Sequence, residues 1–283
     1  MVKLLRNYIK SIFKKFIFQL KEFLNLDKLN NNELEGHFNK LTYIKVIKKT
    51  PLEVPFYLGR SARGLSFNEN QISKDPIFNL FLDVSKEKPF KEIMNNFSNT
   101  LKNESKLSVS ELLGIKSEKL SKFPPWSTVL PWEVEDIDDK YKNYEKTQFL
   151  KREEKAIEYN FVHKISKNYR IYSSETAESQ IRQTQSLFAS ISKYGYQTNL
   201  GIPSFHILVK NNQWRWYMSQ GNHRAYILYL LKNDYMFGTI DSIIKKSDVL
   251  KWHNVKNGLF KVDEAEKLFD YIFEGKKIIK PCI

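Results

Sequence analysis

The most constraining stretch of the sequence is residues 213–231, where an aromatic run changes into an apolar run of a different spacing. Residues 213–218 are rich in tryptophan and tyrosine, as is typical of a β-strand. The run stops at a Ser-Gln-Gly sequence that ends with Gly221. The apolar residues beyond it share the spacing of one buried helix face: Ala225, Leu228, Tyr229 and Leu231. The stretch therefore predicts a strand, a tight turn and a helix in immediate succession.

The predicted turn has the features of an anion-binding site. The first turn of a helix leaves backbone N–H groups without partners and carries the positive end of the helix dipole. Gly221 allows the backbone a positive φ, and Asn222 is a favourable N-cap residue. His223 and Arg224 add side-chain donors at the same end. The same four residues also suit an ordinary helix cap beside solvated surface, so both interpretations stay open on this turn alone.

The segments on either side of this turn extend the pattern. Residues 178–194 have the periodicity of an amphipathic helix, which Gly195 would end. Residues 201–210 read as a strand, and Asn211-Asn212 as a hairpin turn into the aromatic strand. Residues 237–240 predict a further strand beyond the last helix. The expected order is helix, glycine, strand, hairpin, strand, Gly-x-His-Arg turn, helix and strand.

From residue 129 to residue 240 the sequence resembles the ParB/sulfiredoxin superfamily. The residues that carry the resemblance are Ser190-Ile191, Gly195, the strand at 203–209 and the turn at 221–225. The resemblance implies an α+β fold, with a small mixed sheet and helices, preceded here by a mainly helical N-terminal region. It also implies that the turn grips a nucleotide phosphate.

The residues of the turn separate the branches of this superfamily. Partition ParB proteins usually have Gly-Glu-Arg-Arg at the turn, whereas sulfiredoxins and the free serine kinases have His-Arg, as in His223-Arg224 here. The resemblance to these two branches implies that Gln220, Gly221, Asn222, His223 and Arg224 bind ATP, together with Mg²⁺. Asn222 stands at the sulfiredoxin cysteine position, which excludes thiol-phosphate chemistry on that residue. Gln220 replaces the acidic residue of the serine kinases, so the match to their mechanism is incomplete.

An acidic segment at residues 133–139 interrupts an otherwise basic chain. We expect residues 127–139 to form the first strand and the first loop of the superfamily domain. The serine kinases use a glutamate after that strand as a general base, so the resemblance makes Glu133 or Glu135 the candidate base, with His223 as a further catalytic candidate. A carboxylate there would accept the proton of a hydroxyl group during phosphoryl transfer. A solvated acidic loop that balances nearby lysines is the alternative.

The sequence divides into four expected regions. They are an amphipathic N-terminal helix (1–28), a mainly helical N-terminal region (29–123), the ParB/sulfiredoxin-like domain (124–245) and a C-terminal helical extension (246–283). The first helix has one apolar face and seven basic against two acidic side chains, so it suits either an anionic membrane surface or packing on the rest of the protein. Arg60 and Arg63, each beside a glycine, form a second candidate anion site, or else an exposed turn.

Composition limits the function without deciding it. The net charge of +14 permits nucleic acid, nucleotides, a phosphorylated substrate or an anionic membrane as partner, although lysine-rich codon usage would give the same charge. The single cysteine, Cys282, excludes an internal disulfide and suits the cytoplasm. No apolar run spans a membrane, so we expect a cytoplasmic protein, peripheral on the inner membrane face if residues 1–28 bind lipid. The five histidines have no metal-ligand spacing, and no metal-binding residues are predicted.

Two classes of function follow from these expectations. The first is an ATP-dependent phosphotransferase, or kinase, that acts on a hydroxyl group of a small molecule, a sugar or a membrane-linked glycan. The second is a non-enzymatic, nucleotide-gated or DNA-binding module like ParB. Residues 246–283 leave little room for a helix-turn-helix array and show no recognition-helix pattern, so nucleic acid is the less expected partner.

Overall fold

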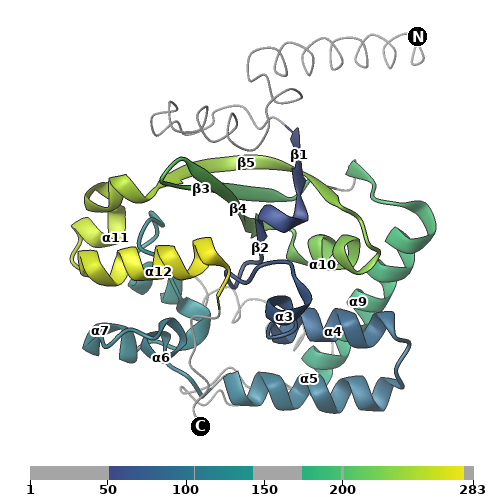
Figure 1. The fold of residues 1–283 in the computed structure, drawn as a ribbon. Helices are drawn as coiled ribbons and strands as arrows, with labels where there is room; N and C mark the ends of the chain where they lie inside the picture. The colour runs from purple at the N-terminus through teal and green to yellow at the C-terminus, as the bar shows by residue number, and fades with distance from the viewer. Residues whose placement is uncertain (1–50, 105, 143–173, 199–200, 277–283) are drawn as a thin grey trace, which may run out of the picture.

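The protein is an α+β structure in the computed structural model, which describes residues 51–104, 106–142, 174–198 and 201–276. Its centre is a five-stranded mixed sheet with the order β1-β5-β3-β4-β2 (Figure 1). The strands are β1 (Pro51–Pro55), β2 (Gly59–Arg60), β3 (Ser204–Lys210), β4 (Gln213–Gln220) and β5 (Tyr235–Lys245). The expected α+β class is therefore confirmed, as is the mixed character of the sheet.

The two central strands form the predicted hairpin. β3 pairs with β4 in antiparallel fashion from Ser204 opposite Gln220 to Lys210 opposite Gln213. Asn211 and Asn212 between them have φ values of 47° and 61°. Left-handed conformations at both central residues match the right-handed twist of the flanking strands, and asparagine tolerates them better than most residues. β5 then pairs with β3 in parallel and with β1 in antiparallel fashion, while β2 runs parallel to β4.

The helices follow local start and stop signals. The α-helices are α3 (Glu69–Ile72), α4 (Pro76–Ser85), α5 (Phe90–Glu104), α6 (Val109–Leu113), α7 (Glu118–Ser121), α9 (Ser174–Tyr194), α10 (Asn222–Leu230), α11 (His253–Lys256) and α12 (Val262–Glu274). Short 3-10 helices are η1 (Phe56–Leu58), η2 (Pro125–Ser127) and η4 (Lys246–Lys251). α4, for example, begins with Asp75 as N-cap and Pro76 at its first position, which is the favoured chemistry of a helix start. Gly195 follows α9 with a φ of 71°, as expected for a helix stop.

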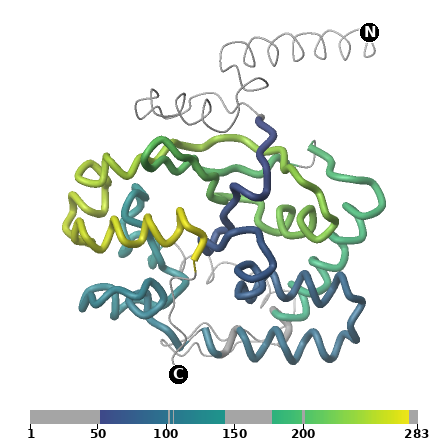
Figure 2. The backbone as a smooth tube through the Cα atoms, viewed as in Figure 1, coloured from purple at the N-terminus to yellow at the C-terminus, as the bar shows by residue number. Residues whose placement is uncertain are grey.

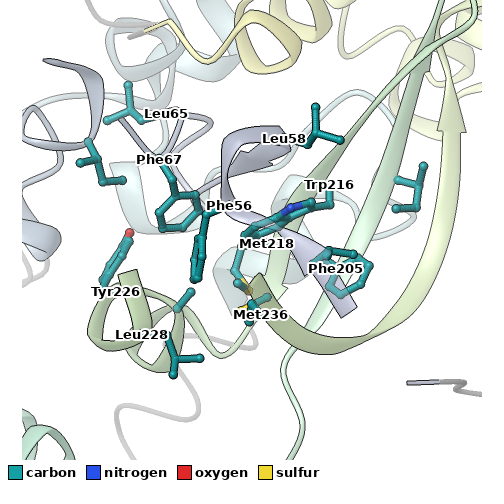
Figure 3. Packing of buried hydrophobic residues seen from close by; sticks show 14 of the residues in the cluster. Phe56, Leu58, Leu65, Phe67, Phe205, Trp216, Met218, Tyr226, Leu228 and Met236 are labelled. Atoms are coloured by element: carbon teal, nitrogen blue, oxygen red, sulfur yellow. The ribbon is translucent and has the colours of Figure 1, made fainter. Parts of the chain in front are cut away.

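The sheet is buried on both faces. Alternate residues of β4 point to opposite sides, so Trp214, Trp216 and Met218 join α3, α4, α9 and α10 in one core. Trp216 is fully buried at its centre, and its ring lies 5.3 Å from that of Phe67 (Figure 3). Tyr217 faces the other core, which contains the apolar face of α12. Figure 1 shows α12, α6 and α7 to the left of the α3, α4, α9 and α10 group.

The structure differs from the expected domain division at residue 124. β1 and β2 come from the segment assigned to a separate helical region, yet they pair with β5 and β4. Figure 2 shows this purple segment running from the sheet into the body of the molecule, between the yellow α12 and the green α10. The strand expected within residues 127–139 is absent from the structure, because these residues form the end of η2, a loop and the start of a helix at residue 137.

Two other expectations concern the membrane. None of the helices in the described part of the chain is both long enough and apolar enough to cross a bilayer. The predicted amphipathic helix at 1–28 lies outside the described residues.

Candidate functional site

The strand, turn and helix predicted from the sequence are present at the end of β4. Gly221 is the N-cap of α10 and has a φ of 91°, a conformation that favours glycine. A Cβ atom at this position would lie only 2.8 Å from Cβ of Pro203, so the close approach of two chain segments also requires glycine. Among the described residues, the backbone N–H groups of Asn222 and His223 have no hydrogen-bond acceptor. These two donors point out of the first turn of a nine-residue helix, where an anion is stabilised.

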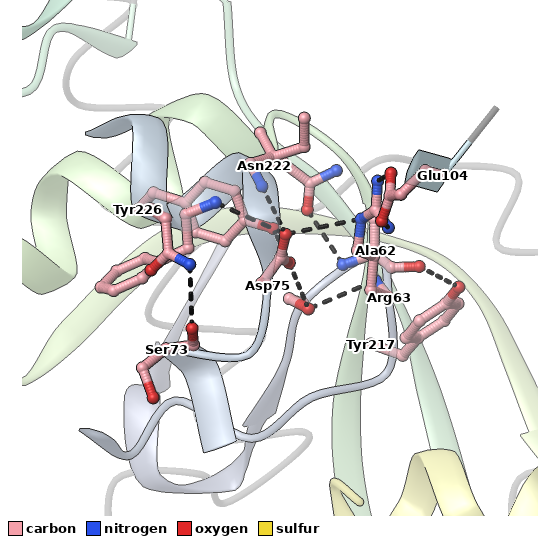
Figure 4. A network of polar contacts seen from close by, with 12 residues as sticks. Ala62, Arg63, Ser73, Asp75, Glu104, Tyr217, Asn222 and Tyr226 are labelled. Atoms are coloured by element: carbon pink, nitrogen blue, oxygen red, sulfur yellow. Dashed lines mark hydrogen bonds and ion pairs between the residues drawn. The ribbon is translucent and has the colours of Figure 1, made fainter. Parts of the chain in front are cut away.

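Asn222 does not act as the N-cap that the sequence suggested. It is the first residue of α10, and its side-chain Oδ1 accepts a hydrogen bond from the backbone N–H of Ala62 at 3.0 Å (Figure 4). The carbonyl of Ala62 in turn accepts from the hydroxyl of Tyr217 at 2.8 Å. Because β2 and β4 are parallel, the loop after β2 and the turn after β4 emerge at the same end of the sheet. Asn222 therefore holds this loop against the turn.

A buried carboxylate joins the same loop to α10. Asp75 is fully buried, and it accepts hydrogen bonds from the hydroxyls of Tyr226 (2.6 Å) and Ser61 (3.3 Å). It also accepts from the backbone N–H groups of Ile77 (2.9 Å) and Phe78 (3.4 Å) at the start of α4. Burial, followed by the charge of Asp75, raises the pKa of Tyr226 well above its usual value, so this phenol remains a donor. We call Ser61, Arg63, Asp75, Glu104 and Tyr226 the Asp75 cluster.

Arg63 completes the Asp75 cluster. Its Nε lies 3.4 Å from Oδ1 of Asp75, and its two terminal nitrogens donate to the two oxygens of Glu104 at 2.5 and 2.8 Å. Burial acts to lower the pKa of Arg63, but the charges of Glu104 and Asp75 outweigh it and raise that pKa. One guanidinium thus lies between two carboxylates beside the candidate anion site.

The side chains of His223 and Arg224 have different surroundings. The ring centroid of His223 lies 5.0 Å from that of Phe81, and burial, followed by the charge of Arg224, lowers its pKa. His223 is therefore a neutral, packed imidazole at neutral pH, able to donate from only one nitrogen. The guanidinium of Arg224 lies against Gly201, since a Cβ there would be 3.4 Å from one of its nitrogens. Gln220 ends β4 opposite Ser204 and is exposed.

Hydrogen bonds from Asn254 hold the acidic loop, residues 130–136, in place. This fully buried side chain donates to the carbonyls of Leu130 (3.0 Å), Glu133 (3.0 Å) and Glu135 (3.4 Å), and its backbone N–H donates to the carbonyl of Pro131 (3.0 Å). We call Asn254 and these carbonyls the Asn254 cluster. An amide donor that satisfies several loop carbonyls replaces the hydrogen bonds that a strand would have supplied.

The two candidate bases are placed differently on this loop. Oε2 of Glu133 accepts from the backbone N–H of Leu130 (3.1 Å) and from Lys140 (3.2 Å), and its side chain is 31% exposed. Burial, followed by the charge of Glu133, raises the pKa of Tyr217, so Glu133 lies within electrostatic reach of the tyrosine that binds Ala62. Glu135 is exposed on the surface. Among the described residues, neither carboxylate has a hydrogen bond or an ion pair with residues 220–224.

Arg60 is not available for an anion. Its guanidinium is buried and donates to the carbonyls of Ile272 (3.0 Å), Phe273 (2.6 Å) and Gly59 (2.7 Å). It therefore satisfies the C-terminal carbonyls of α12, where the helix dipole favours a cation. Burial and the neighbouring Arg215 lower the pKa of Arg60 to about 9.

Sequence reasoning missed the residues that join these loops, namely Asp75, Tyr217, Tyr226 and Asn254. An Asp-Pro pair is a recognisable helix start, so the role of Asp75 as a cap had a local signal. The contacts of Asp75 with Ser61, Arg63 and Tyr226 had no local signal in the sequence. A metal centre is a separate question: across the described ranges, no three His, Cys, Asp or Glu side chains gather closely enough to hold an ion. Mg²⁺ bound with a nucleotide would have phosphate oxygens and water as its main ligands.

No protein-family model, no curated protein and no solved structure matches this chain.

Proposed function

We propose that the protein is an ATP-dependent phosphotransferase that transfers phosphate to a hydroxyl group and that holds the nucleotide phosphates at residues 220–224. The observation that carries the proposal is the Gly221 turn, where the N–H groups of Asn222 and His223 in the first turn of α10 have no acceptor within the described part of the chain. Such a turn stabilises phosphate through oriented backbone donors and the helix dipole. Arg224 adds a permanent positive charge at the same end of the helix.

Glu133 is the proton acceptor in this proposal. The acceptor hydroxyl attacks the γ-phosphorus, the bond from that phosphorus to the bridging oxygen breaks, and the hydroxyl proton passes to the Glu133 carboxylate. Leu130 and Lys140 orient one oxygen of this carboxylate, which leaves Oε1 for the incoming hydroxyl. Mg²⁺ that arrives with the nucleotide would supply positive charge against the charge that develops on the phosphate. The neutral imidazole of His223 donates one hydrogen bond at the phosphate turn.

The acceptor class follows from the proposed chemistry and from the resemblance of the turn. A small molecule, a sugar or a membrane-linked glycan each offers the hydroxyl that this reaction needs. A glycan acceptor requires the protein to reach a bilayer, and residues 1–28 are the segment that would bind the anionic membrane surface. Association with the inner membrane face is therefore part of the same proposal.

Calorimetric titration of ATP and of CTP, each with Mg²⁺, into the full chain tests the proposal. We expect ATP to bind the wild type and to lose about tenfold or more in affinity in Arg224→Ala, because a charge-assisted phosphate contact disappears. Arg182→Ala is the matched control, since this arginine is a largely exposed residue of α9 that pairs with Glu178 four residues away and lies over the ring of Phe90. Binding of CTP alone would favour a nucleotide-gated module like ParB. Binding of neither nucleotide would mean that the turn is only a helix cap.

A further inference from the structure

We propose that Arg63 is a second phosphate-binding residue of this site, and that Glu104 occupies its guanidinium when no nucleotide is bound. The inference rests on the proposed function and specifies how the site would recognise and admit phosphate. It assigns a role to the one ion pair of the Asp75 cluster that joins two partly exposed side chains, with 32% exposure at Arg63 and 22% at Glu104.

The geometry of the pair is that of an anion site already occupied. The two terminal nitrogens of Arg63 each donate to one oxygen of Glu104, at 2.5 and 2.8 Å. Phosphate presents two oxygens to arginine in the same parallel arrangement. Asp75 contacts the Nε edge of the guanidinium at 3.4 Å and is fully buried. Asp75 therefore keeps the guanidinium oriented when the opposite edge exchanges one anion for another.

The pair also lies beside the phosphate turn. Arg63 follows Ala62, whose backbone N–H binds the side chain of Asn222 at the start of α10. Asp75, which holds Arg63, also binds Tyr226 one helical turn further along α10 (Figure 4). The first turn of α10 and the guanidinium of Arg63 are thus fixed to the same short loop and the same carboxylate. A nucleotide with several phosphates offers anionic groups to both.

Glu104 is suited to being displaced. It is the last residue of α5, where the negative end of the helix dipole disfavours a carboxylate. Partly exposed ion pairs contribute little net stability, because solvent screens them and two long side chains must be ordered. Two carboxylates share the single guanidinium of Arg63, so the negative charge of Glu104 competes directly with that of a phosphate.

The test is a substitution that should improve binding. In Glu104→Gln, we expect the affinity of the full chain for ATP with Mg²⁺ to rise about fivefold to tenfold, a range typical of coupling between competing interactions. Inorganic tripolyphosphate should show the same rise, whereas adenosine should show none, because the competition concerns phosphate alone. Glu92→Gln is the matched control: it removes one negative charge from the same helix, where Glu92 pairs with Lys88, and should change neither affinity.

A second pair of variants separates this role from a structural one. Arg63→Lys keeps the charge but loses the bidentate hydrogen bonding. We therefore expect weaker ATP binding, and no further gain in ATP affinity when Glu104→Gln is added. Thermal unfolding confirms that each variant is folded. If folded Glu104→Gln binds ATP no more tightly than the wild type while Arg224→Ala still loses binding, the pair is purely structural and the inference is overturned. If neither wild type nor Glu104→Gln binds ATP or tripolyphosphate, the inference and the proposed function are both overturned.

Discussion

The Asp75 cluster and the Asn254 cluster fix two irregular loops by opposite chemical means. Asp75 binds Tyr226 of α10, 151 residues away, and holds the loop after β2 through Arg63 and the hydroxyl of Ser61. Asn254 reaches Leu130, 124 residues away, and holds its loop through carbonyl acceptors alone. Asp75 is thus a charged acceptor of hydrogen bonds at the centre of its cluster, whereas Asn254 is a neutral donor at the centre of its own.

This chemical difference indicates which of the two loops can respond to a ligand. Ion pairs exchange partners when another anion arrives, because guanidinium groups bind carboxylate and phosphate alike. An amide that satisfies buried carbonyls has no such substitute, since any group that displaced it would leave acceptors unpaired. In the proposed function, the Asp75 cluster is therefore the side of the site that responds to phosphate, and the Asn254 cluster is the support of the loop that carries Glu133.

The largest expected effect comes from placing a carboxylate, as at Asp75, in the buried position of Asn254. We expect Asn254→Asp to lower the free energy of unfolding by about 4–5 kcal/mol, because a buried carboxylate would face the carbonyls of Leu130 and Glu133. Chemical denaturation measures the loss. Asn257→Asp, at an exposed position on the same turn of chain, should cost less than about 0.5 kcal/mol. A loss as small as that of the control would show that a carboxylate and an amide can replace each other at this position.

The reverse substitution, Asp75→Asn, should be less damaging. The amide oxygen can replace Oδ1 and still accept from the start of α4. The amide NH₂ then faces the hydroxyls of Tyr226 and Ser61, which must accept instead of donate, and the charge opposite Arg63 is lost. We expect a loss of about 2–3 kcal/mol, in the range for a weakened buried hydrogen-bond network. Asp83→Asn on the same helix, where Asp83 pairs with Lys88, provides the control for an ordinary ion pair. Equal losses of unfolding free energy at Asp75 and Asp83 would mean that Asp75 contributes no more than an ordinary ion pair.

The turn beside the Asp75 cluster is tested by Gly221→Ala. A side chain there is disfavoured by the φ of 91° and by the contact with Pro203, so we expect a loss of about 1–2 kcal/mol together with weaker ATP binding. Gly258→Ala separates the two causes, because Gly258 has a φ of 69° but no atom within 4 Å of the added Cβ. If both variants lose the same stability, the close approach to Pro203 contributes nothing.

The smallest predicted effect is on pH dependence near α10. Burial and Arg224 lower the pKa of His223 below the ordinary value of 6.5, so the unfolded chain binds a proton before the folded protein does. The part of the stability that depends on a neutral His223 is therefore fully present above about pH 6.5, and it is lost as the pH decreases from there. Burial lowers the pKa of His206 as well, despite the opposing charge of Asp241, and adds to the same trend.

Denaturation of the wild type and of His223→Gln at about pH 7.5 and about pH 5.5 measures this trend, because the difference between the two conditions reports proton uptake on unfolding. We expect the variant to lose less stability than the wild type on acidification. His253→Gln, next to the Asn254 cluster, is the comparison on the other side of the site. An unchanged pH response in His223→Gln would contradict the assignment.

The elements whose signals are local could be predicted from the sequence alone. The aromatic strand, the Gly221 turn and α10 were predicted at their observed positions, as were the Asn211-Asn212 hairpin and the end of α9 at Gly195. Strand alternation, helical periodicity and positive φ values act over a few residues, so neighbouring residues are enough to specify them. The expected α+β class followed from these elements.

The partners of the polar side chains, in contrast, depend on how distant segments pack together. Asn222 was predicted as a helix cap and instead holds Ala62, while Arg60 was a candidate anion ligand and instead satisfies the end of α12. β1 and β2 joined the sheet from a segment assigned to another region, because a strand of five or two residues carries almost no periodic signal. A buried polar group takes whichever partner folding brings within hydrogen-bond distance, and at separations above 100 residues that partner depends on the whole fold rather than on local sequence.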